Sequence, residues 1–219
     1  MSLSQILSEA LIRELDAAYY GCEWHCMSKD EIAEMLDSDL EKGMTMAVAS
    51  EKMETQGPNF IPSPQPCPQW MCCLLPWLKN TASMRSYNRC IAESAQTIRS
   101  GRCLCIDSFS VVRGDIVYVE QGDVIPADCR IISCSKDLTL YAFDFEDSKL
   151  HSEDVTATSR QSFLESTNIL YAGSLVVSGQ AKGIVVNIGK DTVMAEIIER
   201  RAWPITNQNT DTHRLLPPV

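Results

Sequence analysis

The chain has 219 residues, of which 45% are hydrophobic and 22% charged, which suits one or two small domains with a hydrophobic core. Its net charge of −10 at pH 7 argues against nucleic-acid binding and against a general attraction to anionic lipids, since acidic chains repel phosphate groups. Met1–Leu15 lacks the basic start and apolar stretch of a signal peptide. The longest apolar run, Met71–Leu78, is far shorter than the about 20 residues of a membrane-spanning helix, so no transmembrane span is expected.

The first 60 residues show the apolar spacing of helices. Apolar side chains recur every three or four residues from Ser2 to Tyr20, which predicts a first helix. Ser28 and Glu31 form the pattern of a capping box, which predicts a second helix there. Its expected apolar face consists of Ile32, Met35 and Leu36.

A third helix is expected to begin after Thr45, which has the side chain of an N-cap, and to end at Gly57. Ile61–Pro68 then contains four prolines, which predicts an extended linker rather than a part of the core. Ser83–Ser94 has a weak helical pattern and leads into the next region.

From Gln96 onward, short apolar runs separated by turn residues predict β-strands. Asp144–Ser166 is a polar stretch without a predicted element, and Thr192–Arg201 has the pattern of a short helix. The strands are expected at Thr97–Arg99, Cys103–Ile106, Val111–Val112, Ile116–Val119, Cys129–Ile132, Ile169–Ala172, Ser174–Val177 and Ala181–Asn187.

These patterns predict an α+β fold in three parts. Residues 1–68 form a helical N-terminal region with a proline-rich linker, and residues 79–201 form a β domain with short flanking helices. Residues 202–219 are polar and rich in proline, and we expect them to be a disordered tail.

Ten cysteines are spread along the chain, and without a signal peptide we expect reduced thiols in a cytosolic protein. A zinc site is the alternative, because His25 lies between Cys22 and Cys26, but no matching second pair of ligands follows. The cysteines are Cys22, Cys26, Cys67, Cys72, Cys73, Cys90, Cys103, Cys105, Cys129 and Cys134.

Three aspartates in the β region lie in turn-forming sequences. Asp115 and Asp123 each follow a glycine, and Asp128 follows Pro126-Ala127. A metal cluster is conceivable from three carboxylates, but the turn context favours capping of backbone N–H groups.

Two blocks of the sequence resemble the P-type ATPase family. The first runs from His25 to Trp70 and includes Gly57-Pro58-Asn59; it is similar to the cation-transporter N-terminal region of sodium/potassium and proton/potassium pump α-subunits. The second is similar to the actuator domain of P-type pumps, a distorted β jelly roll with short helices. It consists of Val111–Val117, Gly122–Ile132, Asn168–Ser174, Ser178–Val186 and Gly189–Met194.

The resemblance implies that the matching motif residues have structural roles, and Arg130–Ser133 together with the first block favours the sodium/potassium type. These motif residues are Gly57, Pro58, Asn59, Gly114, Asp115, Gly122, Asp123, Pro126, Ala127, Asp128, Gly173, Gly179 and Gly189.

The actuator loop departs from the family. There, a Thr-Gly-Glu-Ser motif supplies a glutamate that positions water for attack on an aspartyl-phosphate. An alignment without gaps from Ile132 places Phe145, Glu146, Asp147 and Ser148 on that motif. Asp147 is one methylene shorter than glutamate, so we expect Glu146 and Asp147 to be solvated loop acids rather than catalytic groups. An interaction role for the loop stays open.

A second departure concerns the membrane. The family has two transmembrane helices between the first block and the actuator domain, whereas here Trp70–Leu78 passes almost directly into Lys79–Ser94. Met71–Leu78 is interpreted as a remnant that packs against the domain or touches a membrane surface. The sequence also lacks an Asp-Lys-Thr-Gly phosphorylation motif, so no cofactor is expected for this chain, although the family uses ATP and Mg²⁺.

Three functional hypotheses follow. The first is an inactive, truncated pump relative, located in the cytoplasm or associated with a membrane, whose partner is a full-length P-type pump subunit or a pump regulator. The second is a fragment of a working plasma-membrane transporter that exchanges sodium and potassium. The third is an independent cytosolic scaffold that binds through the acidic stretch Asp144–Asp154.

Overall fold

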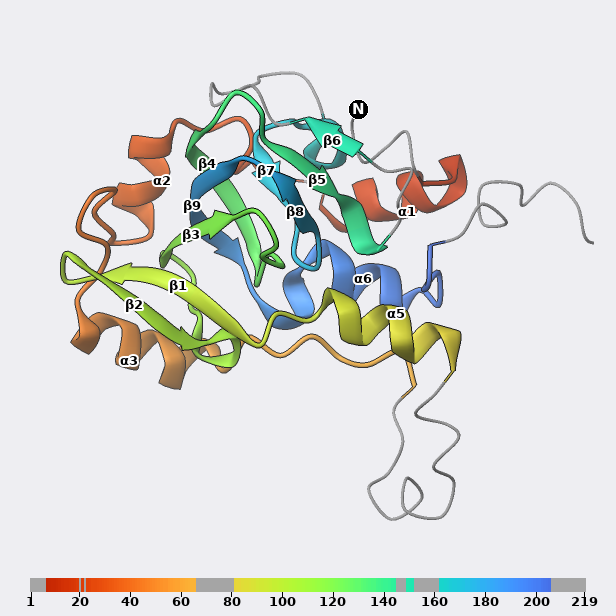
Figure 1. Cartoon of the computed structure of the whole chain (residues 1–219), viewed down its shortest axis with the longest axis horizontal. Helices are drawn as coiled ribbons and strands as arrows, with labels where there is room; N and C mark the ends of the chain where they lie inside the picture. The colour runs from red at the N-terminus through yellow and green to blue at the C-terminus, as the bar shows by residue number, and fades with distance from the viewer. Residues whose placement is uncertain are drawn as a thin grey trace, which may run out of the picture.

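The computed structural model describes residues 7–19, 21, 23–65, 81–144, 149–151 and 162–205. Figure 1 shows strands at the centre and helices around them. The helices are α1 (Glu9–Ala18), α2 (Lys29–Met35), α3 (Met46–Gln56), α5 (Ala82–Cys90) and α6 (Val193–Glu199). Single 3-10 turns are η3 (Ser108–Ser110), η4 (Ala142–Asp144), η5 (Phe163–Glu165) and η6 (Gly189–Asp191).

Two antiparallel sheets form the centre. The six-stranded sheet has the order β2-β1-β3-β9-β4-β7, and the three-stranded sheet has the order β6-β5-β8. The strands are β1 (Ser94–Arg99), β2 (Arg102–Asp107), β3 (Ile116–Glu120), β4 (Asp128–Cys134), β5 (Thr139–Tyr141), β6 (Lys149–His151), β7 (Ile169–Leu170), β8 (Leu175–Ser178) and β9 (Gln180–Asn187). This combination of helices and antiparallel strands confirms the α+β prediction.

Local sequence signals explain most helix starts. The capping box of α2 is present: the Ser28 N–H donates to Glu31 Oε2 at 2.8 Å, and the Glu31 N–H donates to Ser28 Oγ at 3.2 Å. Thr45 caps α3, and Gly57 ends it with φ 78°. The helix predicted from Ser2 to Tyr20 does not include Ser8, because extended Ser8 is the N-cap of α1; Ser2 itself lies outside the described residues. Met35, expected on the apolar face of α2, is 60% exposed, and Ala33 is buried instead.

The strand predictions need three corrections. Val111 and Val112 are fully buried but form no strand, because the Val112 N–H donates to the Asp115 carboxylate and closes a turn. No pattern predicted β5, or β6 in the polar stretch, since strands of three residues are too short to show alternation. By contrast, the predicted β1–β2 hairpin is present and turns through Ser100 and Gly101, both with positive φ.

The helical and β-rich parts share a core. Leu11 and Leu15 of α1 belong to the same buried cluster as the strands, and Ile32 of α2 packs with Ile116, Ile184 and neighbouring residues. Ile61, predicted to lie in an exposed linker, is also in the core.

The end of the described chain also belongs to the domain. Trp203 and Ile205 are each 8% exposed and lie in the main core cluster, so the expectation of disorder from residue 202 onward is wrong for these residues. Residues 206–219 lie outside the described part. Among the helices that the structure describes, none combines the length and the apolar character needed to cross a bilayer.

Candidate functional site

The actuator-like loop is framed by the β5–β6 hairpin. Leu140 pairs with Leu150 and Tyr141 with Lys149, so residues 142–148 connect the ends of two paired strands. The predicted loop residues Glu146, Asp147 and Ser148 lie outside the described residues, so their roles stay predictions.

The start of this loop is anchored in the core. Phe143 has the left-handed backbone φ 52°, ψ 43° and is only 1% exposed. Its ring meets Trp203 edge-to-face, with 6.2 Å between the ring centroids. The loop is therefore held by a contact between residues 60 positions apart, which sequence reasoning missed because Trp203 was assigned to the tail.

Asn59 joins three segments that are distant in the sequence. Its side-chain amide donates to the carbonyls of Ser108 at 3.0 Å and Pro126 at 2.9 Å. Its Oδ1 accepts the N–H of Gly189 at 2.8 Å. Because every polar atom of this buried amide is paired, Asn59 fixes the end of the N-terminal block against two actuator-like motifs.

The position of Gly189 favours glycine for two reasons, its backbone conformation and a close neighbouring backbone. Its φ is 54°, and a Cβ at this position would lie 3.1 Å from the carbonyl oxygen of Phe60. The backbone after Asn59 and the η6 turn therefore approach each other at a distance that leaves little room for a side chain.

Asp115 is not only a turn residue. Its carboxylate accepts from Arg99 Nε at 2.8 Å and from Arg99 Nη2 at 2.5 Å, which is a bidentate ion pair. Both side chains are buried, at 7% and 0% exposure. Arg99 also donates to the Ser110 carbonyl at 2.9 Å. The sequence analysis did not predict this pair. The available signal was that Arg99 lies on the same face of β1 as Ala95 and Thr97, which is the buried face, where a charged side chain requires a partner.

Asp128 connects β4 to two other elements. Its Oδ1 accepts the Ala172 N–H at 2.9 Å, and its Oδ2 accepts the Val193 N–H at 3.0 Å and Asn187 Nδ2 at 3.4 Å. The side chain is fully buried. Burial raises the pKa of Asp128 from 3.8 to about 7, against the lowering effect of the three hydrogen bonds.

This pKa predicts a specific pH dependence of stability. The folded chain holds a proton on Asp128 that the unfolded chain has already released, so the resulting stabilisation is present below pH about 4 and is lost as the pH rises through about 7. We expect the urea midpoint of the wild type, relative to that of Asp128→Asn, to decrease as the pH is raised from about 4 to about 7. Parallel profiles, or a rise with pH, would show that the hydrogen bonds outweigh the burial.

The remaining motif residues occupy separate turns. Asp123 Oδ2 accepts the Glu120 N–H at 2.9 Å beside Gly122, and Gly173 and Gly179 flank β8. The three aspartates are therefore engaged in separate hydrogen-bond networks: Asp115 and Asp123 accept N–H groups of their own turns, and Asp128 accepts from distant segments. Within the described ranges no group of three or more His, Cys, Asp or Glu side chains could hold a metal ion.

Of the three residues of the zinc hypothesis, Cys22 lies outside the described residues, and Cys26 and His25 lie within them. His25 is 6% exposed, packs edge-on against Phe163, and accepts a hydrogen bond from Asn168 at its backbone carbonyl. These contacts support the structural role expected for it.

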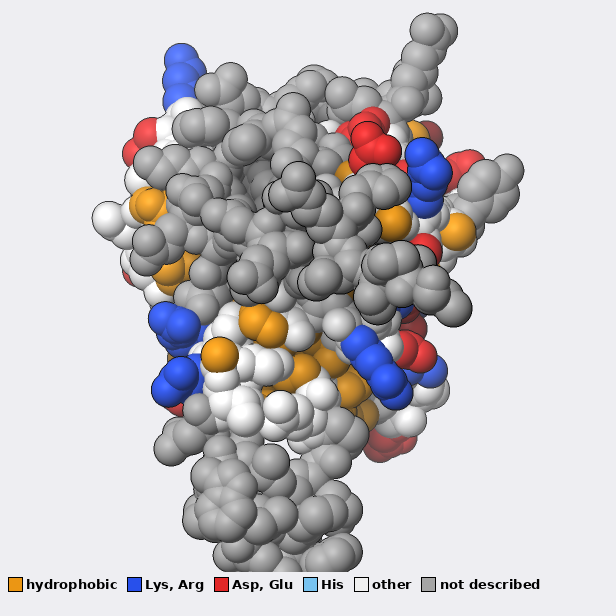
Figure 2. All heavy atoms as spheres, turned by 90° about the vertical axis from the view of Figure 1, so that its right-hand side faces the viewer, with side chains coloured by type: hydrophobic (Ala, Val, Ile, Leu, Met, Phe, Trp, Pro, Cys, Tyr) orange, Lys and Arg blue, Asp and Glu red, His pale blue; other side chains and the backbone are white. Residues whose placement is uncertain are grey.

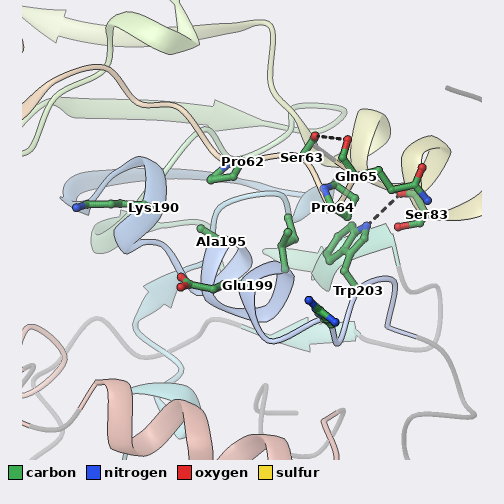
Figure 3. A pocket seen from close by; sticks show the side chains of 11 residues that line it. Pro62, Ser63, Pro64, Gln65, Ser83, Lys190, Ala195, Glu199 and Trp203 are labelled. Atoms are coloured by element: carbon green, nitrogen blue, oxygen red, sulfur yellow. Dashed lines mark hydrogen bonds between the residues drawn. The ribbon is translucent and has the colours of Figure 1, made fainter. Parts of the chain in front are cut away.

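A hollow of about 890 Å³ lies beside Gln65 and Ser83, close to the described residues on either side of the segment 66–80. Pro62, Gln65, Ser83, Lys190 and Trp203 are among the side chains that line it (Figure 3). The Trp203 indole N–H donates to the Ser83 carbonyl at 3.2 Å. Figure 2 shows the face on this side of the molecule, where exposed hydrophobic side chains lie between Lys and Arg side chains.

The two ends of the intervening segment lie next to each other. Thr81 Oγ1 donates to Gln65 Oε1 at 3.4 Å, and 15 residues, 66–80, separate these two positions in the sequence. Two membrane-spanning helices require about 40 residues, so a helix pair does not fit between these ends.

Comparisons with known proteins agree with this architecture. Residues 89–201 match the P-type ATPase actuator domain, and residues 24–80 match the cation transporter/ATPase N-terminus. The actuator match spans 113 of the 219 residues, and the chain therefore belongs to the P-type ATPase family.

Among solved structures, the chain is similar to a zinc-transporting PIB-type ATPase in its E2.Pi state, with a TM-score of 0.41 and 17% identity. The match covers 57% of this chain and 20% of that one. By its two family matches, the chain corresponds to the N-terminal and actuator parts of a P-type ATPase.

Proposed function

We propose that this chain is a pump relative of the sodium/potassium type whose actuator module no longer promotes dephosphorylation and instead regulates a full-length cation pump. The observation that carries the proposal is the length of the segment between Gln65 and Thr81: its 15 residues are too few for the family's first helix pair. A module that is not tied to its own helix pair at this point is free to associate with another pump.

The loop sequence supports the loss of chemistry. In the alignment without gaps, Phe145-Glu146-Asp147-Ser148 takes the place of Thr-Gly-Glu-Ser, while the β5–β6 hairpin and the buried Phe143 hold the start of the loop. The sodium/potassium type is supported by the His25–Trp70 block and by Arg130–Ser133. A scaffold is thus retained without the glutamate that the reaction requires.

The proposed location is the cytoplasmic surface of a membrane that contains the pump. The face in Figure 2 combines hydrophobic side chains with Lys and Arg, and Asp and Glu side chains lie beside them. Arg85 of α5 and Arg201 after α6 are exposed, and the apolar residues Met71–Leu78 follow Gln65 in the sequence. Positive side chains on this end favour contact with a surface of negative charge.

The test is sedimentation of the purified, tagged chain with membranes that contain the sodium/potassium pump, and with protein-free vesicles of the same lipids. We expect the chain to sediment with pump-containing membranes and to be crosslinked to the pump α-subunit. Arg85→Glu/Arg201→Glu should weaken this binding, whereas Arg102→Glu/Lys136→Glu, exposed elsewhere, should not.

Two outcomes would contradict the proposal. Equal sedimentation with the protein-free vesicles would show that lipid, not the pump, is the partner. No sedimentation with either would favour the independent scaffold.

A further inference from the structure

Strand β2 lies at the edge of the six-stranded sheet and has one strand neighbour, β1. Its residues are exposed or half-buried along the whole length of the strand. Cys103 and Cys105 are both exposed and both free thiols, whereas Cys90 and Cys129 are buried and Cys26 and Cys134 are half-buried. Among the cysteines that the structure describes, these two are the accessible pair.

The two thiols lie on the same face of β2, since side chains two residues apart in a strand point to the same side. Cys105 is directly opposite Gln96 of β1. The Cys103 thiol donates to Gln96 Oε1 at 3.5 Å, so it leans along the strand toward Cys105. The amide that the Cys103 thiol contacts therefore belongs to the cross-strand neighbour of Cys105.

We propose that Cys103 and Cys105 form a two-thiolate binding site for a soft monovalent cation, Cu(I). Their Cα atoms are about 6.6 Å apart along a strand. With metal–sulfur bonds of about 2.3 Å, the two sulfur atoms on one ion are at most about 4.6 Å apart. Rotation of the two exposed side chains brings the sulfur atoms to this separation. On binding, each thiol releases one proton, and the Cu(I) bis-thiolate carries a single negative charge.

The surroundings favour a soft ion of low coordination number. Zinc takes four ligands in a tetrahedron, and in the described part of the chain no third His, Cys, Asp or Glu completes such a set. Asp107 follows on the same strand, but its carboxylate accepts the Phe109 N–H at 2.8 Å and caps η3. Thiolate ligands select Cu(I) over hard cations, which prefer oxygen.

Access to the site is open. A hollow of about 340 Å³ adjoins Cys105, with Gln96 and Tyr118 also in its lining. A copper donor such as a small thiol complex can approach there and exchange its ligands for the two strand thiols.

The test uses the full chain with Cys90 and Cys129 retained and six cysteines replaced by serine: Cys22→Ser, Cys26→Ser, Cys67→Ser, Cys72→Ser, Cys73→Ser and Cys134→Ser. Cu(I) is titrated without oxygen against a chromogenic copper chelator. We expect one Cu(I) per chain with two sulfur ligands by X-ray absorption. Once one thiolate has bound Cu(I), the other thiolate binds the same ion within the same molecule. Loss of this second copper–sulfur bond in Cys103→Ser or Cys105→Ser should therefore weaken binding about tenfold or more.

The double variant Cys103→Ser/Cys105→Ser should bind Cu(I) only a little more weakly than either single variant. Binding that the single variants merely halve in stoichiometry would show two independent thiols and would overturn the site. Equal affinity for Zn(II) in the same competition would overturn the assignment to Cu(I). Unchanged unfolding midpoints of the variants serve as the control for folding.

Discussion

A sodium/potassium pump whose actuator domain is replaced by residues 94–201 of this chain is expected to form its aspartyl-phosphate but to hydrolyse it about 10²–10⁴-fold more slowly. The reason is the proposed alignment without gaps, in which Asp147, one methylene shorter, takes the place of the glutamate that positions the attacking water, and Glu146 takes the place of a glycine that permits a tight turn. The measurement is the decay of radiolabelled phosphoenzyme after a chase with unlabelled ATP.

Restoring the motif provides the matched control. The triple change Phe145→Thr/Glu146→Gly/Asp147→Glu in the same chimera should recover most of the hydrolysis, whereas Asp147→Glu alone should recover less, because the neighbouring glycine is still absent. Normal formation of the phosphoenzyme shows that the chimera folds. Rapid decay without the triple change would falsify the proposed loss of chemistry.

Replacement of Arg99 by methionine is expected to reduce the free energy of unfolding by about 3–5 kcal/mol. The substitution leaves the Asp115 carboxylate, which is completely buried, without its bidentate partner. It also removes the donor to the Ser110 carbonyl. Urea unfolding followed by circular dichroism measures the change.

The hairpin supplies a matched control for this experiment. Arg102 pairs with Arg99 across the β1–β2 turn but is exposed, so Arg102→Met should change stability by no more than about 0.5 kcal/mol. The double variant Arg99→Met/Asp115→Asn should lose less than the sum of the two single changes, since it buries no unpaired charge. Similar losses for Arg99→Met and Arg102→Met would contradict a stabilising role of the buried pair.

The pump-binding proposal and the copper site concern different parts of the molecule. The first involves the end of the domain near Gln65 and Thr81, and the second involves the exposed strand β2. Variants in one region are therefore expected to leave the other activity intact, so the failure of either proposal does not decide the other.

Features set by neighbouring residues could be predicted from the sequence. Ser28 and Glu31 are three positions apart, and the hairpin loop is Ser100-Gly101, so capping and turn chemistry indicated both correctly. The start of α1 was missed because the apolar pattern continues through Ser8.

The tertiary structure alone shows how these local features combine. Asn59 finds its partners 49, 67 and 130 residues away, and Phe143 meets Trp203 across the core. Composition marked Ile61 and Trp203 as parts of a linker and a tail, yet both are buried. Prolines and polar neighbours determine local backbone preference, whereas burial depends on which distant apolar surfaces a segment meets once the chain has folded.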